Sequence, residues 1–251
     1  MYTTHPLVIA PDLNQSLWRY QDLTKFLNLI HSSRLFFCRV DRLGDPFEGS
    51  YPKINAEFRV EWYKDILEKL KTTPEKFFPI LSNHHETIRK YIFANCWHMN
   101  FGESAAMWRL YGPHDSSIAL KTTFSKLTTS FDNTDIEIYI GKMNYLDYRE
   151  NVIAEGNAFV QVLHKQLSYE HEKELRAITF LPNDQKSILE HKGLTTENGI
   201  YVDVNLNELI EEIYISPDAP NGFAQTVQKT IEDAGLGCPL KQSTLRNVPF
   251  F

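Results

Sequence analysis

The sequence lacks several patterns that define large classes of protein. Its three cysteines, Cys38, Cys96 and Cys238, are too few and too scattered for a disulfide framework or a zinc knuckle. No apolar run approaches the roughly 20 residues that span a bilayer, and the first residues lack the charged-then-apolar order of a signal peptide. We therefore expect a soluble, reduced, cytoplasmic protein without a membrane partner.

Internal repeats, Gly/Ser linkers and blocks of like charge are also missing. What remains is 251 residues of ordinary globular composition, 42% hydrophobic and 13% aromatic, which excludes disordered and low-complexity classes. Because 26 Lys and Arg stand against 32 Asp and Glu, the formal net charge is −6. That balance disfavours a general nucleic-acid-binding surface. Composition alone indicates no function.

Hydrophobic periodicity predicts helices and strands that alternate irregularly. The predicted helices are 23–30, 56–71, 84–90, 104–111, 123–131, 151–167 and 219–234. The predicted strands are 35–40, 91–99, 118–121, 136–145, 174–181, 199–204 and 212–215. Residues 44–52 are dense in turn formers and are predicted to be a loop. This spacing is too uneven for a doubly wound sheet, so we expect one α+β domain over residues 1–251. Its sheet should be mixed, mostly antiparallel and flanked by helices, with residues 1–16 as an N-terminal extension.

The first candidate binding residues are Arg19 and Tyr20, in the sequence Trp18-Arg19-Tyr20 before the first predicted helix. An Arg between two rings can be held by stacking, with its guanidinium directed at a phosphate or carboxylate. The alternative is a surface Arg flanked by two core rings.

Charged residues concentrate where the first predicted strand ends. They are Arg39, Asp41, Arg42, Asp45 and Glu48. The three carboxylates are ligands that a divalent cation prefers, but their spacing does not match the Ca²⁺ loop. An Asp before Pro is typical of a turn, so a turn is favoured over a metal site.

The segment 96–111 holds the next candidates. Ser104 lies near a predicted helix N-terminus, where backbone N–H groups favour an anion, and Trp108 and Tyr111 share its face. The segment offers a hydroxyl and an aromatic wall for a nicotinamide or a base, unless the rings simply fill the core. Cys96 with His98 supplies too few ligands for a structural zinc site.

Glu172, Glu174 and Arg176 follow one another at every second position. In an extended chain all three point to one face. Neighbouring carboxylates repel, so the pKa of one is expected to rise, and the nearby Arg opposes that rise. Such a pair suits general-base or oxocarbenium-stabilising work at a sugar carbon. The alternative is a solvated, Glu-rich end of a strand or helix.

These segments together resemble a known family. The order WRY, LFFCRVDRLGDPFEG, CWH…ESAAMWRLYG and SYEHEKELRAI is similar to the bacterial domain-of-unknown-function 2971 family, from about Leu17 to the helix after Pro220. More distantly, the chain resembles the ADP-ribosyltransferase (DarT-like) fold. That fold places an Arg or His on an opening strand, a Ser/Thr or aromatic segment in the middle and a Glu on a late strand. This chain has no Ser-Thr-Ser triplet, and its DPFEG loop has no clear counterpart.

The second resemblance implies a site for NAD as substrate. The residues that would bind NAD are Arg19, Tyr20, Ser104, Trp108 and Tyr111. Glu174 would stabilise the oxocarbenium ion as nicotinamide leaves, and Glu172 would orient the nucleophile of an acceptor. The acceptor is left open between protein, nucleic acid and water.

Three functions are consistent with the sequence. The first is an ADP-ribosyltransferase-like enzyme of toxin or phage-defence type that needs no metal. The second is a metal-dependent nuclease, with Asp41, Asp45 and Glu48 joining the two late glutamates around Mg²⁺ and Arg19 or Arg176 on phosphate.

The third is a non-catalytic binding module. In it Glu174 and Arg176 would pair with Arg39 or Asp45 in a buried ion network, with Glu48 as a further supporting residue. We expect the first function and keep the other two open.

Overall fold

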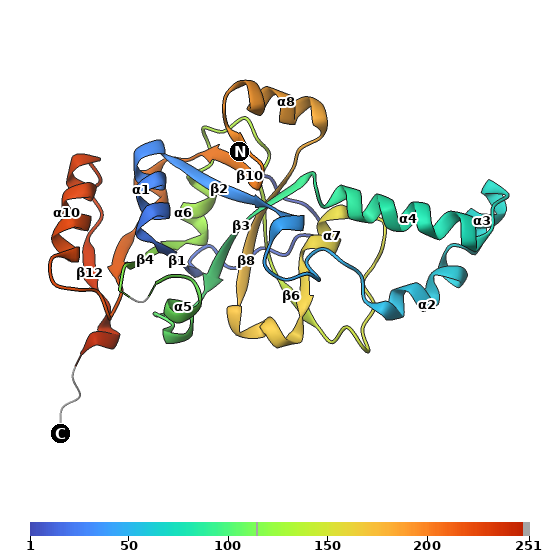
Figure 1. Ribbon diagram of the computed structural model, residues 1–251, viewed down its shortest axis with the longest axis horizontal. Helices are drawn as coiled ribbons and strands as arrows, with labels where there is room; N and C mark the ends of the chain where they lie inside the picture. Colours follow the sequence, from blue (N-terminus) through green and yellow to red (C-terminus); the bar gives the residue numbers. More distant parts are fainter. Residues whose placement is uncertain (114, 248–251) are drawn as a thin grey trace.

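A computed structural model describes residues 1–113 and 115–247. Its main sheet contains β1 (Ser16–Asp22), β2 (Arg34–Arg39), β3 (Ile92–Met99), β4 (Ser117–Thr123), β5 (Tyr139–Lys142), β8 (Glu174–Phe180), β9 (Thr195–Thr196), β10 (Gly199–Asp203), β11 (Glu212–Ile215) and β12 (Leu240–Gln242). The strand order is β12-β11-β4-β1-β3-β2-β10-β9; beside this order, β8 pairs with β3 and β5 pairs with β8 (Figure 1). Within this sheet only the β11–β12 pair of the described strands is parallel. Short β6 (Asn144–Leu146) and β7 (His164–Gln166) form a separate parallel pair.

Helices surround this sheet. They are α1 (Leu23–Ser32), α2 (Lys53–Trp62), α3 (Lys64–Leu70), α4 (Pro74–Ile88), α5 (Ala105–Leu110), α6 (Phe124–Thr129), α7 (Ala158–Val162), α8 (Asn183–His191), α9 (Leu206–Leu209) and α10 (Phe223–Asp233). Three short 3₁₀ turns are η1 (Val40–Arg42), η2 (Leu167–Glu172) and η3 (Thr244–Arg246). The predicted class is therefore confirmed: an α+β fold with a mixed, mostly antiparallel sheet flanked by helices.

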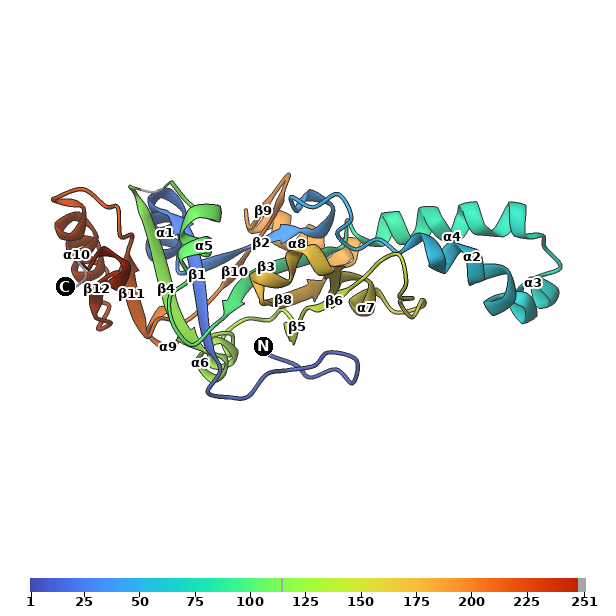
Figure 2. The same cartoon turned by 90° about the horizontal axis from the view of Figure 1, so that it is seen from below.

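The sheet divides at β3. One edge of β3 pairs with β8 from Ile92 to His98. Its other edge is shared, because β1 pairs with β3 only near Met99 and β2 pairs with it only near Phe93. Beyond those short ladders β1 and β2 diverge, and α1 joins them. Figure 2 shows β1 and β4 running at a steep angle to β2 and β8. The fork between the two halves is where the candidate site lies.

Helix α1, which directly follows β1, packs one apolar face into the hydrophobic core. Phe26, Leu29 and Ile30 of α1 are buried, at the spacing of one helical face. Asp22 begins the helix, because its side chain accepts a hydrogen bond from Lys25 N at 2.8 Å. These residues pack with Trp97, Phe37 and the other members of the largest core cluster. This packing fixes the position of α1 between β1 and β2.

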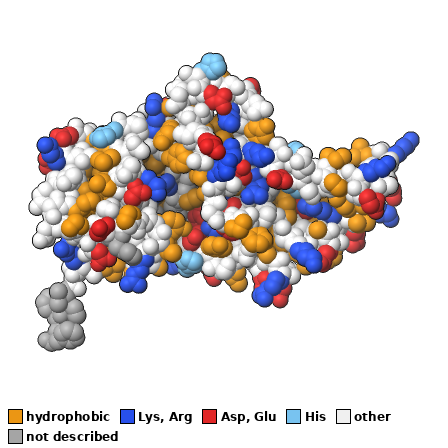
Figure 3. Space-filling model, viewed as in Figure 1, with side chains coloured by type: hydrophobic (Ala, Val, Ile, Leu, Met, Phe, Trp, Pro, Cys, Tyr) orange, Lys and Arg blue, Asp and Glu red, His pale blue; other side chains and the backbone are white. Residues whose placement is uncertain are grey.

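Helices α2, α3 and α4 project from the sheet as an arm (Figures 1 and 2). None of the fifteen residues of α4 is buried. Hydrophobic side chains lie among charged ones over the arm (Figure 3). The arm's exposed large hydrophobic residues are Phe58, Val60, Trp62, Ile66, Leu70 and Ile80. Its base is fixed to the body by Glu155, which accepts hydrogen bonds from Arg59 Nε at 3.0 Å and Tyr63 Oη at 3.1 Å.

The predicted helix 151–167 is wrong. Only α7 is helical in this range, and residues 164–166 form β7. Gly156 has φ +98°, and the side chain of Asn157 accepts hydrogen bonds from Phe159 N and Val160 N. This cap begins the helix seven residues later than the apolar spacing predicted.

Several other boundaries also differ from the prediction. Helix 56–71 begins three residues earlier and is divided at Tyr63, whose φ and ψ are −100° and 10°. Helix 84–90 is only the end of α4, because Pro79 stands inside that helix and obscured its earlier turns. The predicted strand 136–145 is divided between β5 and β6, which belong to different sheets. The predicted helix 219–234 begins later, at Phe223.

Residues at the N-terminus lie against the body. Tyr2 forms a bridge with Ile138, and the ammonium group of Met1 donates to Thr134 O at 2.8 Å. Among the described residues, no helix combines the length and the apolar character needed to cross a membrane.

Candidate functional site

A cavity of about 790 Å³ lies where β1 and β2 part from β3. We call it the fork cavity. Of the predicted site residues, Arg19, Tyr20, Asp45, Glu48, Tyr111, Glu172, Glu174 and Arg176 line it. Ser104, Trp108 and Arg39 do not. The fold therefore brings together residues that are up to 157 positions apart in the chain.

Arg176 lies at the base of the fork cavity on β8, and its side chain is 1% exposed. Its two terminal nitrogens donate to the two oxygens of Glu48, Nη1 to Oε2 at 2.9 Å and Nη2 to Oε1 at 3.1 Å. Its Nε donates to Glu174 Oε1 at 2.8 Å, and Nη1 also donates to Val162 O at 2.8 Å. This guanidinium is thus held by charge-assisted bonds on two sides.

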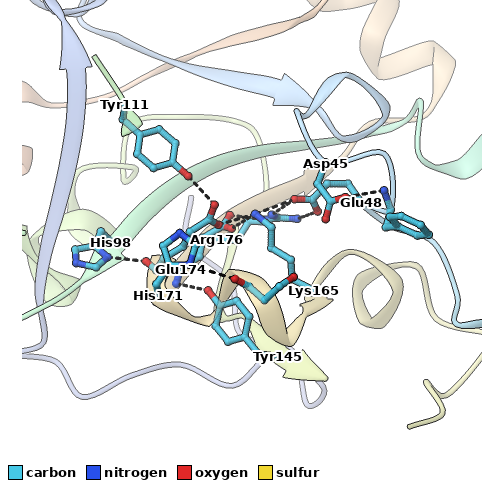
Figure 4. Close-up of polar contacts among 12 residues, drawn as sticks. Asp45, Glu48, His98, Tyr111, Tyr145, Lys165, His171, Glu174 and Arg176 are labelled. Carbon is cyan, nitrogen blue, oxygen red and sulfur yellow. Dashed lines mark hydrogen bonds and ion pairs between the residues drawn. The ribbon is translucent and has the colours of Figure 1, made fainter. Parts of the chain in front are cut away.

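Lys165 on β7 is the second buried cation (Figure 4). Its Nζ lies 2.5 Å from Glu172 Oε2, 3.3 Å from Glu48 Oε1 and 3.5 Å from Glu174 Oε2. The sequence interpretation missed this residue, because it fell inside the predicted helix 151–167. No spacing relates it to Glu48, so only the fold reveals the contact.

The pKa of Glu174 depends on the two cations beside it. Burial acts to raise it, but Arg176 and then Lys165 outweigh burial and hold the pKa of Glu174 well below its usual range. Glu174 is therefore not the carboxyl group whose pKa rises, and Arg176 acts on it in the predicted direction. The expected extended run is also incomplete, since Glu172 ends η2 and Lys173 has φ +41° before β8 begins.

Tyr111 links the two sides of the fork through a hydrogen bond to Glu172, one of the carboxylates that contact Lys165. Its hydroxyl, at the end of α5 on the β1 side, donates to Glu172 Oε1 at 2.9 Å (Figure 4). Burial first, and the nearby Glu172 second, raise the pKa of Tyr111, so this hydroxyl stays protonated and donates. Behind Glu172, His98 Nδ1 donates to the backbone oxygen of that residue at 2.6 Å. Burial lowers the pKa of His98, which keeps the ring neutral near pH 7.

Arg19 occupies the other side of the fork cavity. Its Nη1 donates to the backbone oxygen of Cys96 at 2.6 Å, and its guanidinium carbon lies 5.8 Å from the ring centroid of Trp97. The expected stacking between Trp18 and Tyr20 is wrong. Those two rings lie on the opposite face of β1, where they stack on each other at 6.3 Å. Among the described residues Arg19 forms no ion pair with a carboxylate.

The segment 104–111 contributes fewer of its predicted site residues to the fork cavity than expected. Ser104 is the cap of α5, since its Oγ accepts from Met107 N at 3.4 Å and its own N–H donates to Tyr20 Oη at 2.8 Å. Trp108 is buried in a separate core cluster with Met107, Trp18 and Tyr20. Only Tyr111 of the three predicted residues therefore reaches the fork cavity.

The predicted partners of the ion network are also corrected. Arg39 pairs with Asp41, at 2.5 Å from Nε to Oδ1, rather than with Glu174. Asp45 accepts from Phe47 N at 2.9 Å, as expected for a turn. The network expected for Glu174 and Arg176 is present, but its other members are Glu48 and Lys165.

Metal-binding groups are not found in the part of the chain that the structure describes. No three His, Cys, Asp or Glu side chains are placed there to hold a metal ion. The arrangement of Asp41, Asp45 and Glu48 around Mg²⁺ is therefore not formed, since Asp41 binds Arg39 and Glu48 binds Arg176.

No protein-family model and no curated protein matches the chain, so membership of the unknown-function family stays a prediction. A solved structure of DarT from Thermus sp. 2.9 in complex with carba-NAD⁺ is similar to 95% of this chain over 100% of its own length. The sequence identity is 7% and the TM-score is 0.39, so the function must be argued from the site itself.

Proposed function

We propose that the protein is an ADP-ribosyltransferase-like enzyme that cleaves the nicotinamide–ribose bond of NAD in the fork cavity. The observation that carries the proposal is the separation of charge within this cavity. Arg19 stands on one wall without a carboxylate partner among the described residues. On the other wall, Glu48, Glu172 and Glu174 outnumber the two cations Lys165 and Arg176.

NAD matches this separation of charge. Its pyrophosphate is anionic, and its nicotinamide ring is cationic. A guanidinium is well suited to the oxygens of a pyrophosphate, and surplus carboxylate is suited to a cationic ring. The volume of about 790 Å³ falls within the range of roughly 300–1,000 Å³ typical of small-molecule sites. Aromatic residues that line the cavity, including Trp97 and Phe36, offer surfaces for its two ring systems.

Glu174 is proposed as the catalytic carboxylate. When the bond between ribose C1′ and the nicotinamide nitrogen breaks, its electron pair leaves with neutral nicotinamide and positive charge develops on the ribose. An ionised carboxylate that is already in place stabilises this charge without reorganisation. Arg176 and Lys165 keep Glu174 ionised. Glu172 would orient the acceptor, which attacks C1′ and loses its proton.

The proposal is tested by thermal-shift titration with NAD and by measuring nicotinamide release. A ligand at a hundred times its Kd stabilises the folded state by about 2.7 kcal/mol. We expect such a shift in the parent, its loss in Arg19→Ala, and its retention in Glu174→Gln together with at least a hundredfold slower nicotinamide release. Arg149→Ala is the matched control, since this side chain is 87% exposed.

A second candidate function is favoured by the buried ion network itself. A non-catalytic binding module would need the same contacts only for stability. In that case millimolar NAD would produce no shift in the parent, and Glu174→Gln would lower the melting temperature sharply. That pair of results would replace the enzymatic proposal.

A further inference from the structure

Lys165 has an unusual position in the fork cavity. Its side chain is 8% exposed, and its single ammonium group contacts carboxylates from three separate elements. Glu48 comes from the loop after η1, Glu172 from η2 and Glu174 from β8. One point charge therefore connects the loop after η1 with the consecutive elements β7, η2 and β8.

The contacts of Glu172 show why the position of Lys165 is important for the two neighbouring carboxylates. Both Glu172 Oε2 and Glu174 Oε2 lie within 3.5 Å of the same nitrogen, so the two carboxylates are close neighbours. Arg176 pairs with Glu174 and Glu48 but not with Glu172. Among the described residues, Lys165 is the cation that Glu172 contacts. Two close carboxylates without a cation between them repel each other, so the pKa of one of them rises.

We infer that Lys165 is a positioning residue that keeps Glu172 and Glu174 ionised together, and so lets one serve the ribose while the other serves the acceptor. The division of roles between the glutamates rests on the proposed function. The electrostatic role of Lys165 does not, since it follows from the contacts alone.

Other titratable and charged groups also face Glu172 and Glu174 and affect whether the two carboxyl groups are ionised. Arg176 lies on the far side of Glu174, and the thiol of Cys96 on β3 also faces Glu174. Tyr111 donates to Glu172. The remaining neighbours are Tyr145, which accepts from Glu174 N at 2.7 Å, and Tyr169, whose ring centroid lies 4.6 Å from Lys165 Nζ. None of the tyrosines or the thiol carries a positive charge, so none replaces the ammonium.

The direct test follows the carboxyl groups themselves. Glutamate side-chain carboxyls are labelled with ¹³C and titrated by NMR in the parent, Lys165→Met, Lys165→Arg and the surface control Lys186→Met. The Glu172→Gln and Glu174→Gln spectra assign the two signals. We expect one of the two to titrate more than about one pH unit higher in Lys165→Met, and both to titrate as in the parent in Lys165→Arg.

The functional consequence is measured on the same proteins. The acidic limb of the pH profile of nicotinamide release should move to higher pH in Lys165→Met by a similar amount, and Lys165→Arg should restore it. Unchanged carboxyl titration in Lys165→Met would overturn the inference while leaving the proposed function intact. A shifted carboxyl in a parent that releases no nicotinamide would instead overturn the proposed function, and the electrostatic role would stand.

A second variant separates the removal of the ammonium from the change in net charge of the buried network. Lys165→Met removes a buried positive charge, whereas Glu48→Gln/Lys165→Met also removes one negative charge and restores the balance. The double variant leaves Glu172 and Glu174 as neighbours without the ammonium. The same upward shift of one carboxyl is therefore expected there, and its absence would contradict the inference.

Discussion

The guanidinium of Arg176 and the carboxylate of Glu48 meet in a two-bond ion pair, although 128 residues separate them in the chain. Both side chains are almost completely buried, 1% and 2% exposed. The pair fastens the loop after η1 to β8 beneath the fork cavity. Breaking this pair should therefore destabilise the fold.

We expect Arg176→Met to reduce the free energy of unfolding by about 3–5 kcal/mol, because it leaves Glu48 and Glu174 short of a buried partner. Glu48→Gln/Arg176→Met should lose less than the sum of the two single variants, since the two residues act as a unit. Urea unfolding measures both. The exposed Arg149→Gln should show no measurable change, and an Arg176→Met protein as stable as this control would show that the pair contributes nothing.

Tyr111 and Glu172 connect the two sides of the fork through one hydrogen bond of 2.9 Å. We expect Tyr111→Phe to destabilise the protein by about 1–2 kcal/mol, since the hydroxyl donates to a charged group. A double-mutant cycle with Glu172→Gln should give a coupling energy above about 0.5 kcal/mol.

The matched control for this cycle is Tyr139→Phe with Glu137→Gln, an exposed pair with a similar distance of 3.0 Å. Its coupling energy should be smaller, because an exposed bond competes with water. Equal coupling in both cycles would mean that the contact across the fork has no special weight.

The strands that the sequence predicted well are those whose formation depends on residues within the strand itself. The strand 212–215 matches β11 at both ends, and β8 and β3 differ from prediction by one residue at one end. Short apolar runs bounded by turn formers are buried strands for reasons contained within the run itself. Eight of the eleven predicted site residues also line one cavity, since their chemistry was concentrated on strand ends and adjoining loops.

What sequence could not predict depends on long-range contact. Glu48 was predicted as part of a turn and as a supporting residue without a named partner, and its pairing with Arg176 exists only after β2 and β8 have folded together. Lys165 was hidden by the helix predicted for 151–167, which a glycine with positive φ and an Asn cap prevent. The sequence predicted a raised pKa for one carboxyl of the pair and an opposing effect of the nearby Arg, but not that Lys165 would join Arg176 in lowering the pKa of Glu174.

Acid should destabilise the fold by protonating Glu212 as well as carboxylates in the fork cavity. Burial acts to raise the pKa of Glu212, but hydrogen bonds from Lys241, Tyr214 and Lys121 outweigh it and lower this pKa to about 2. A carboxyl with a lowered folded-state pKa contributes stability above its unfolded pKa of 4.5, and this stability is lost as pH falls toward 2.

Unfolding by urea between pH 6 and pH 2 measures this dependence. We expect the parent to lose stability more steeply than Glu212→Gln as pH falls below about 4.5, because the variant has no carboxyl to protonate there. Parallel curves for the two proteins would show that this pKa is not lowered.

The helical arm should depend on Glu155 at its base. The side chain of Glu155 is 3% exposed and accepts hydrogen bonds from Arg59, Asn55 and Tyr63. Because α4 buries no residue, its packing adds little to the contacts at the base of the arm. Glu155→Gln keeps the shape of the side chain but leaves the guanidinium of Arg59 without its carboxylate. We therefore expect faster amide hydrogen exchange in α2 and α3 and unchanged exchange in β3 and β8.

Glu86→Gln is the control for this variant, since Glu86 is exposed on α4 and the change removes the same charge from the arm. It should leave the exchange of α2 and α3 as in the parent. If Glu155→Gln were to behave like this control, packing rather than the buried carboxylate would hold the arm. If it were to speed exchange in β3 and β8 as well, the arm and the sheet would unfold as one cooperative unit.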